Sequence, residues 1–309
     1  MRIAITGVAG FIGANLARKL IDSNMDVLGI DNLSYGLREN IPAGVEFHNR
    51  DIRNPELGEL FTGADVVFHL AAKNCITDCQ ADPIETADIN VIGTINVFEA
   101  ARRAGIRKII YAESSALYEG ISLFPTPESA VQPESFYAVS KLAGMHFAEA
   151  YKRYYGMTIT ALRYFCVYGP VQDYRRTIPP VMSAFIIKLL KGERPIIYGT
   201  GEKRRDFVYV DDVNDFHLLC LRDSRTDHET FNLGSGENHS VLEIYELVSR
   251  LLGVRLEPEF KPDLPGEAQK TLADITKASA LGWKPKTDLE TGLLRAIDYI
   301  KSEMAEGRI

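Results

Sequence analysis

The stretch that decides the fold is Arg2-Ile3-Ala4-Ile5-Thr6-Gly7-Val8-Ala9-Gly10-Phe11-Ile12-Gly13. Its apolar start predicts a short buried strand over 2–6, and periodic apolar side chains predict a helix over 11–23. Gly7, Gly10 and Gly13 form a GxxGxxG pattern at the junction. Such glycines permit a tight turn and let backbone amides and the helix N-terminus approach a pyrophosphate. By themselves they are also compatible with a plain turn and close helix packing.

Outward from this stretch, strand-like and helical runs alternate. Strands are expected at 27–30, 45–48, 64–70, 108–112 and 158–163, and helices at 84–104 and 135–155. This alternation predicts an α/β fold with a doubly wound parallel sheet of the Rossmann type.

Beyond about residue 165 the alternation gives way to a mixed pattern. Short strands are expected at 195–198, 207–210 and 230–233, with helices at 179–191, 211–222, 241–252 and 289–304. We therefore predict a dinucleotide-binding domain over 1–165 and a smaller mixed α/β substrate lobe over 166–309. The lobe should cover the carboxyl ends of the strands, where ligands bind in such folds, and interleave with the first domain.

Composition narrows the function classes. The chain has 309 residues and a net charge of −7, so a broad attraction to nucleic acid or to an anionic membrane is not expected. No apolar stretch has spanning length, and the N-terminus does not read as a signal peptide. Four cysteines show no zinc spacing, so we expect free thiols, no metal site and a cytoplasmic location.

Two acids follow predicted strands at the cofactor side. Asp31 ends the second strand, where a carboxylate can accept hydrogen bonds from both hydroxyls of an adenosine ribose. It would repel a 2′-phosphate, so NAD is favoured over NADP. Asp51, followed by Ile52, comes after the third strand and can meet the adenine amino group; a solvated loop acid is the alternative.

Tyr137 and Lys141 form a YxxxK pair in a predicted helix. Positions i and i+4 share one helix face, so the ammonium can lie close to the phenol. A nearby cation favours the phenolate and lowers the tyrosine pKa, which would give a general base for a sugar or alcohol hydroxyl. A chance helical pair is the alternative for this motif alone.

Taken together, these motifs resemble the extended short-chain dehydrogenase/reductase family. The resemblance covers nearly the whole chain and is nearest to its nucleotide-sugar epimerases, such as UDP-glucose (UDP-galactose) 4-epimerase. It rests on segments 6–13, 31–34, 51–53, 69–72, 90–94, 114–115, 137–141, 168–170 and 205–212.

The resemblance implies a role for each matching residue. Tyr137 would be the acid/base, Lys141 would hold the nicotinamide ribose, and Ser114 would hydrogen-bond the reacting 4-hydroxyl, with Ser115 as the less favoured alternative. The residues implied to bind NAD are Gly7, Gly10, Phe11, Ile12, Gly13, Asp31, Asn32, Asp51, Ile52, Leu70, Ala71, Ala72, Asn90, Tyr137 and Lys141.

The residue types that directly follow Ser114 distinguish the reactions catalysed by members of this family. Related 4,6-dehydratases carry an acidic pair there and decarboxylases carry a glutamate, whereas this chain has Ser115 and Ala116. The expected reaction is therefore NAD-dependent epimerisation at C4 of a nucleotide sugar through a transient 4-keto sugar. A dehydratase or reductase of the same family is the alternative. Glu113 and Glu119 flank the site and are the remaining candidates for such acid chemistry; loop acids that face solvent are the favoured alternative.

The substrate half contains one expected phosphate ligand and one departure. Arg205 precedes a strand-like run and would contact the diphosphate of a UDP-hexose. Its neighbours Lys203 and Arg204 are expected to be solvated. Cys166 stands where the family usually has an asparagine that contacts the diphosphate, and a thiol is a weak hydrogen-bond partner.

A later segment carries the remaining substrate predictions. Leu264 replaces an arginine that often grips the diphosphate, while Glu267 is a candidate for ribose hydroxyls. Thr271 falls where the family sets pocket size, and its small side chain leaves room for an N-acetyl group. The apolar faces of helices 84–104 and 137–155 could pair in a homodimer, as in the family, or pack within one subunit.

Overall fold

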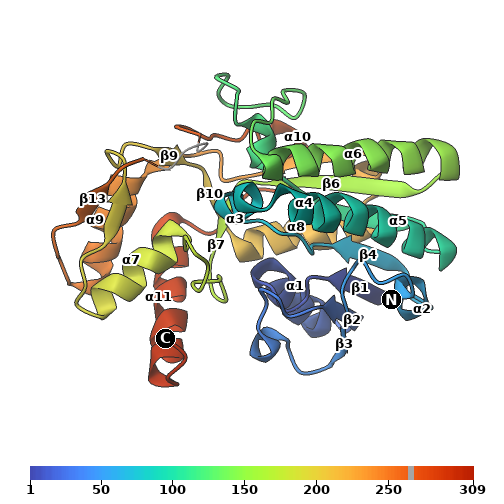
Figure 1. Ribbon diagram of the computed structural model, residues 1–309, viewed down its shortest axis with the longest axis horizontal. Coiled ribbons are helices and arrows are strands. Elements are labelled where there is room, and N and C mark those ends of the chain that lie inside the picture. Colours follow the sequence, from blue (N-terminus) through green and yellow to red (C-terminus); the bar gives the residue numbers. More distant parts are fainter. Residues whose placement is uncertain (264–267) are drawn as a thin grey trace.

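The central layer of the molecule is a parallel sheet, seen in a computed structural model that describes residues 1–263 and 268–309 (Figure 1). Within these residues the sheet has seven strands, and every neighbouring pair is parallel. In spatial order they are β11 (Thr230–Leu233), β6 (Thr158–Tyr164), β5 (Lys108–Ser114), β4 (Val66–His69), β1 (Arg2–Thr6), β2 (Asp26–Asp31) and β3 (Val45–Asn49). The order reverses between β1 and β4, which places a binding crevice at their carboxyl ends. The predicted doubly wound fold is confirmed.

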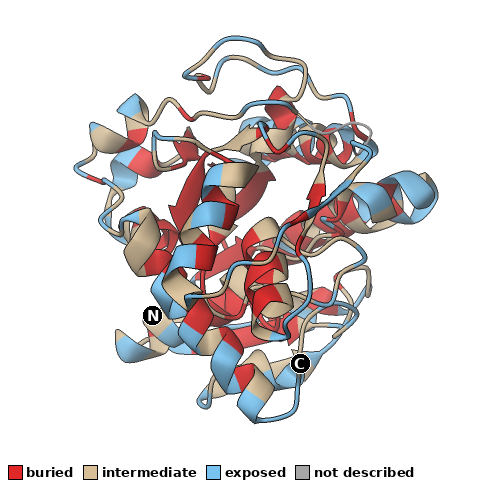
Figure 2. Ribbon diagram, turned by 90° about the vertical axis from the view of Figure 1, so that its left-hand side faces the viewer, coloured by how far each residue is buried: buried red, intermediate tan, exposed pale blue. Residues whose placement is uncertain are grey.

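Helices cover both faces of the sheet and bury its apolar side chains. One face carries α1 (Phe11–Asp22), α8 (Val210–Arg222) and α10 (Thr276–Ser279), and the other α2 (Leu57–Leu60), α5 (Thr94–Arg103) and α6 (Phe136–Tyr155). Leu16 and Phe216 are fully buried on the first face, as is Phe98 on the second. The buried layer between helices and sheet is visible in Figure 2.

The predicted helix over 84–104 is interrupted. It consists of α4 (Pro83–Ala87), a π-helical turn η2 (Asp88–Gly93) and α5. In the wide turn, Asn90 is buried and its side chain bonds both backbone groups of Lys73 and the hydroxyl of Ser140. Wide turns of this kind are frequent near functional sites. Here the turn fixes the loop that follows β4.

The smaller lobe has a core of its own, to the left in Figure 1. Its helices are α7 (Val181–Leu190), α9 (Val241–Leu252) and α11 (Leu289–Ala305). Its strands pair as β7 (Cys166–Tyr168) with β10 (Phe207–Tyr209), β8 (Ile196–Tyr198) with β13 (Glu259–Lys261), and β9 (Arg204–Arg205) with β12 (His239–Ser240). The side chain of Ser240 and that of Glu243 form a capping box that starts α9.

Two elements expected in the smaller lobe lie with the first domain instead. β11 pairs with β6 at the edge of the large sheet, and α8 packs on α1. The short segment Thr230–Leu233 predicts a strand but not the sheet that it joins. Shorter elements are α3 (Ile76–Ala81), η1 (Arg38–Asn40), η3 (Ser115–Tyr118) and η4 (Ser224–Thr226). In the described ranges, no helix has the length and apolar character that crossing a bilayer requires.

Candidate active site

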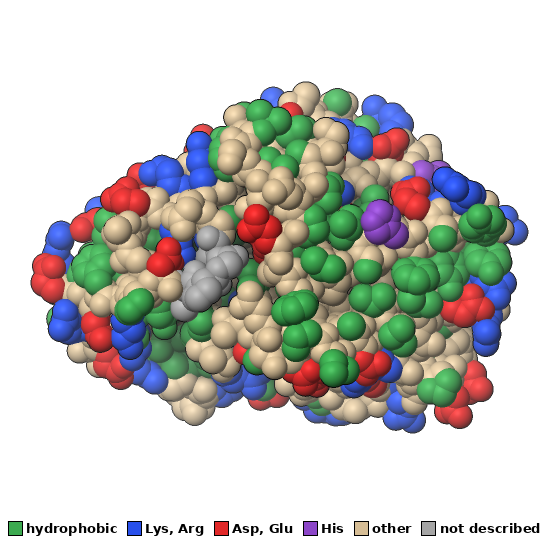
Figure 3. All heavy atoms as spheres, turned by 45° about the horizontal axis from the view of Figure 1, so that its top comes forward, with side chains coloured by type: hydrophobic (Ala, Val, Ile, Leu, Met, Phe, Trp, Pro, Cys, Tyr) green, Lys and Arg blue, Asp and Glu red, His purple; other side chains and the backbone are tan. Residues whose placement is uncertain are grey.

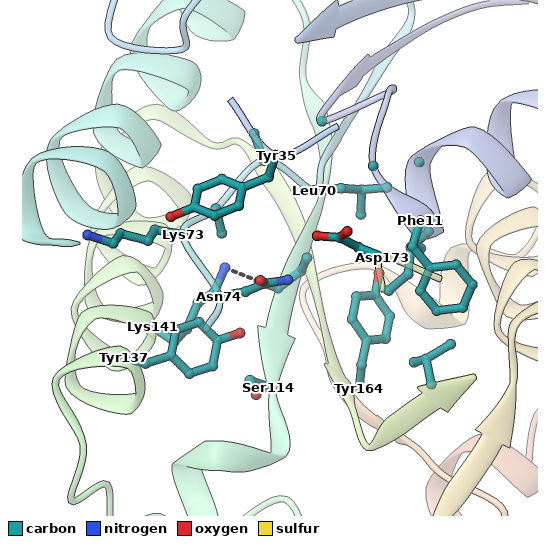
Figure 4. A pocket seen from close by; sticks show the side chains of 18 of the residues that line it. Phe11, Tyr35, Leu70, Lys73, Asn74, Ser114, Tyr137, Lys141, Tyr164 and Asp173 are labelled. Carbon is teal, nitrogen blue, oxygen red and sulfur yellow. Dashed lines mark hydrogen bonds between the residues drawn. The ribbon is translucent and has the colours of Figure 1, made fainter. Parts of the chain in front are cut away.

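A cleft of about 490 Å³ opens at the carboxyl ends of the central strands, between the two lobes (Figure 4). It brings together most of the predicted site residues from both halves of the chain. The predicted cofactor residues that line it are Gly7, Gly10, Phe11, Ile12, Gly13, Asp31, Asn32, Asp51, Ile52, Leu70, Ala71, Ala72, Tyr137 and Lys141.

The glycine turn is closely packed against the neighbouring strand. Gly7 has a positive φ of 79°, and a Cβ there would lie 2.8 Å from the amide nitrogen of Ala71. A Cβ on Gly13 would collide with the carbonyl oxygen of Gly7. Side chains at Gly7 and Gly13 would therefore break the close packing between the turn, the backbone after β4 and the start of α1, whose N-terminus lies at the cleft. This cradle fits the pyrophosphate of a dinucleotide.

The adenosine end of the cleft carries two carboxylates. Asp31 accepts hydrogen bonds from the amides of Ala9 (3.0 Å) and Leu33 (2.8 Å), so it braces the glycine turn, and burial raises its pKa. Asp51 is held by Arg53, whose Nε lies 2.9 Å from Oδ1, and by Asn32. The hydrogen bonds from Arg53 are the main cause that lowers the pKa of Asp51 to about 2. Both acids are therefore preformed hydrogen-bond acceptors.

Asn90 is not among the residues that line the cleft. Its amide holds the backbone of Lys73 at 2.8 and 2.9 Å and lies 3.0 Å from Ser140 Oγ. Asn90 does lie next to the loop after β4, but the π-helical turn directs its side chain toward the buried side of that loop and not into the cleft. The structure thus gives Asn90 a supporting position between the loop after β4 and α6.

Ser114 and Tyr137 form the centre of the site. Ser114 ends β5, and Tyr137 lies in the first turn of α6, which Ser135 caps by accepting the amide of Ala138. Figure 4 shows both side chains pointing into the cleft. Desolvation raises the pKa of Tyr137 to about 12, and a hydrogen bond with Ser114 acts in the opposite direction. The protein alone therefore keeps the phenol protonated at neutral pH.

Lys141 is buried and donates from Nζ to the carbonyl oxygen of Ala112, at 3.0 Å. Its Nζ also lies 5.3 Å from the ring centroid of Tyr111. Burial lowers the pKa of Lys141 to about 8, and the charge of Glu113 opposes that change. The YxxxK spacing therefore brings both residues to the cleft, while the hydrogen bond of the ammonium goes to β5.

The substrate half of the cleft contains three of the predicted residues. Cys166, Arg205 and Thr271 line it, and Thr271 Oγ1 accepts the amide of Asp206 at 3.1 Å. Arg205 donates from Nη1 to the carbonyl oxygen of Arg204, also at 3.1 Å. The predictions for Leu264 and Glu267 fall outside the described residues.

Two acids expected to face solvent do not. Glu113 is 2% exposed and forms an ion pair with Arg163 on the neighbouring strand β6, at 2.7 Å. Glu119 accepts the amides of Glu134 (3.0 Å) and Ser135 (2.7 Å) and so anchors the start of α6. The expectation was wrong for Glu113, which lies inside the buried strand β5 rather than in a loop. Glu119 follows η3 and is half-buried, because its carboxylate is held by the backbone at the start of α6.

The basic cluster was also misjudged. Lys203 is only 6% exposed and pairs with Asp263. Arg204 pairs with Glu243 at 2.9 Å and with Asn238 at 2.8 Å. A run of three basic residues resembles a solvated surface in sequence, but strand pairing between β9 and β12 turns it toward acids of the lobe.

Several lining residues had no signal in the sequence. Arg176 lies in the loop between β7 and α7, and its Nη1 donates to Asn74 Oδ1 at 3.1 Å. Asn74 belongs to the loop after β4, about a hundred residues away along the chain. The other cleft residues of this kind are Tyr35, Arg50, Lys73, Gln172 and Asp173. Among the described residues, no group of three His, Cys, Asp or Glu side chains gathers to hold a metal ion.

Known proteins share this architecture over the whole chain. Residues 3–234 match the NAD dependent epimerase/dehydratase family. A putative UDP-glucose 4-epimerase of Methanocaldococcus jannaschii is 40% identical, over 97% of this chain and 98% of its own. The UDP-glucose 4-epimerase of Thermotoga maritima, solved with UDP-glucose, is 36% identical with a TM-score of 0.95, over 98% and 100% of the two chains. That of Thermus thermophilus, solved with NAD, is 32% identical with a TM-score of 0.90, over 97% and 99%.

A dinucleotide cradle joined to a Ser–Tyr–Lys site defines an enzyme that moves hydride and protons at a bound alcohol. The chain belongs to the NAD dependent epimerase/dehydratase family. The comparisons confirm the predictions of the family, of NAD as its cofactor and of an epimerase, an enzyme of the isomerase class. The glycine cradle and the carboxylate of Asp31 fit NAD, which supplies hydride acceptance and return when it is bound.

Proposed function

We propose that the protein interconverts the C4 epimers UDP-glucose and UDP-galactose, with NAD retained between the two half-reactions. The supporting observation is that Ser114 and Tyr137 point into one cleft, which the glycine cradle and Arg205 also line (Figure 4). The similarity to two UDP-glucose 4-epimerases in sequence and in structure supports the same substrate class.

In this proposal each side chain has one task. Tyr137, as the phenolate, would accept the proton of the 4-hydroxyl, and NAD, when bound, would supply the acceptor for the hydride from C4, which leaves a 4-keto sugar and a protonated Tyr137. Ser114 hydrogen-bonds the same oxygen. After the sugar turns about its diphosphate link, hydride and proton return to the opposite face, and the atoms balance as an isomerisation. Lys141 would hold the nicotinamide ribose of bound NAD, and Arg205 would bind the diphosphate of the substrate.

A dehydration or decarboxylation would require a further acid or base beside Ser114. Positions 115 and 116 hold serine and alanine. Glu113 is tied to Arg163, and Glu119 is tied to the start of α6. The two nearby carboxylates thus have structural partners, which favours simple epimerisation.

The test is incubation of the purified protein with UDP-galactose, and separately with UDP-N-acetylgalactosamine, without added reductant. Proton NMR should show the gluco epimer, and the mass of the product should equal that of the substrate. Because Thr271 is small and lines the substrate half, we expect the N-acetylated sugar to be accepted too. A product of lower mass, or NADH released in stoichiometric amount, would contradict the proposal.

The exposed surface of α4 to α6 supports a homodimer. Ile92, Phe136, Val139 and Phe147 are 40–55% exposed along this surface, and Figure 3 shows apolar side chains gathered on one face of the molecule. Such faces are typical of subunit interfaces. Val139→Glu should yield monomers in sedimentation experiments, whereas Leu294→Glu on α11 should leave the mass unchanged.

We infer a cytoplasmic location as well. Cys75, Cys79 and Cys220 are buried and carry thiols rather than disulfide bonds. Free thiols without partners for disulfide bonds are typical of a reducing compartment. Fractionation of host cells that contain the labelled native protein would test this location. The protein should appear in the cytoplasmic fraction.

A further inference from the structure

The loop between β7 and α7 delivers an arginine to the catalytic tyrosine. Arg176 lines the same cleft as Ser114 and Tyr137, although it comes from the smaller lobe. Its Nη1 donates to Asn74 Oδ1 at 3.1 Å, and Figure 4 shows Asn74 and Tyr137 both pointing into the cleft. The bond joins the loop of the smaller lobe to the loop after β4, and both loops line the cleft that contains Ser114 and Tyr137.

The hydrogen bonding of Arg176 is incomplete. Its Nε is buried and has no acceptor among the described residues. An unsatisfied buried donor costs free energy and in native proteins usually has a functional explanation. A negative charge that develops in the cleft would provide that explanation, because a guanidinium is always protonated.

Lys141 does not provide all of the positive charge that would stabilise the phenolate of Tyr137. Its ammonium is engaged by the carbonyl oxygen of Ala112, and its charge does not rank among the leading influences on the tyrosine. The side chains with the largest influence on the Tyr137 pKa come from four separate elements. They are Ser114 on β5, Cys79 on α3, Arg176 on the loop before α7, and Glu119 after η3.

Of these four, Ser114 and Arg176 lower the pKa of Tyr137, whereas Cys79 and Glu119 raise it. We propose that Arg176 is a positioning residue of the active site, whose guanidinium, oriented by Asn74, stabilises the phenolate of Tyr137 and so prepares it to accept the substrate proton. This role rests on the proposed function. It places a second cation, besides Lys141, at the active site. Since the cation comes from the smaller lobe, the base is complete only while the loop rests on Asn74.

The test measures the ionisation of Tyr137 directly in the protein with NAD bound. Tyrosine labelled with ¹³C at the ring carbon that carries the hydroxyl is titrated by NMR, and the Tyr137 signal is assigned by its absence in Tyr137→Phe. Arg176→Gln should raise the pKa of Tyr137 by roughly one to two units, the effect of losing one opposite charge. Arg176→Lys should keep it near the wild-type value, and Asn74→Ala should lie in between.

Arg175→Gln is the matched control, because this neighbouring arginine instead donates to the carbonyl oxygen of Tyr35 at 2.8 Å. It should leave the Tyr137 titration unchanged. In turnover, Arg176→Gln should shift the rising limb of the kcat–pH profile to higher pH by the same amount. An unchanged Tyr137 titration in a folded Arg176→Gln protein overturns the proposal, whatever the substrate is. Absence of epimerisation in the wild type would instead overturn the proposed function.

Discussion

The two halves of the cleft are assembled in different ways. Most of the proposed cofactor half is built from short segments that directly follow β1, β2, β3 and β4, so these residues lie next to the strand that positions them. Tyr137 and Lys141 on α6 are the exceptions. The sugar half combines Ser114, Arg176, Arg205 and Thr271, which are far apart in sequence and meet only through packing of the smaller lobe. The cofactor half is therefore a local property of the chain, and the sugar half is a tertiary one.

The sharpest test of this contrast is Tyr137→Phe, because it should abolish chemistry without disturbing the cofactor half. Loss of the general base should reduce kcat by about 10²–10⁴-fold. The NAD content of the purified protein should remain that of the wild type. Tyr154→Phe is the control, since Tyr154 lies on the same helix but is 75% exposed. Turnover of Tyr137→Phe within tenfold of the wild type would refute the assigned base.

A second test addresses the stability of the sugar half. Arg163 and Glu113 have side chains that are 4% and 0% exposed, and Arg163 also bonds Tyr118 and the backbone of Glu128. Arg163→Met leaves a buried carboxylate without its partner, which should cost about 3–5 kcal/mol in the free energy of unfolding.

Urea denaturation measures this cost. The control is Arg225→Met, which removes an exposed pair with Asp223 and should change the same free energy by about 0–1 kcal/mol. If both substitutions changed the free energy of unfolding by equally small amounts, the Arg163–Glu113 pair would not stabilise the ends of β5 and β6 next to Ser114.

The contrast also explains which features were predictable. The glycine turn and Asp31 follow from the sequence because their spacing repeats the geometry of one strand, one turn and one helix. Asn90 was placed beside the cofactor but supports its loop from behind, since a π-helical turn leaves no clear mark on apolar periodicity. Arg176 lies among turn-forming residues whose path depends on the lobe as a whole.

Charged residues near Ser114 show the same limit. Glu113 precedes Ser114 in a strand, and its burial depends on Arg163, its partner in register on β6. Nothing local in either segment reveals that the two residues meet. Similarly, β11 is recognisable as a strand, but its place at the edge of the large sheet requires knowledge of the long-range pairing with β6.

A third prediction probes the cofactor half itself. Asp31→Ala removes the carboxylate that bonds the amides of Ala9 and Leu33 and that should accept the ribose hydroxyls. Charge-assisted hydrogen bonds contribute about 1.5–3 kcal/mol each, so the affinity for NAD should fall at least about 100-fold, and discrimination against NADP should weaken. Isothermal titration measures both. Asp26→Ala, at the exposed start of the same strand, should bind NAD normally.

The smallest effect is expected from Arg205→Met in the sugar half. Removal of one charge-assisted contact with the diphosphate should raise KM for UDP-galactose about tenfold while kcat changes little, because this contact is the same in ground and transition states. Arg204→Met is the control, since that side chain pairs with Glu243 and Asn238 outside the cleft. If kcat fell instead and KM stayed constant, Arg205 would act on the chemistry. Arg205 would then take the role of the cation beside Tyr137. Arg176 would take the role of the cation beside the diphosphate.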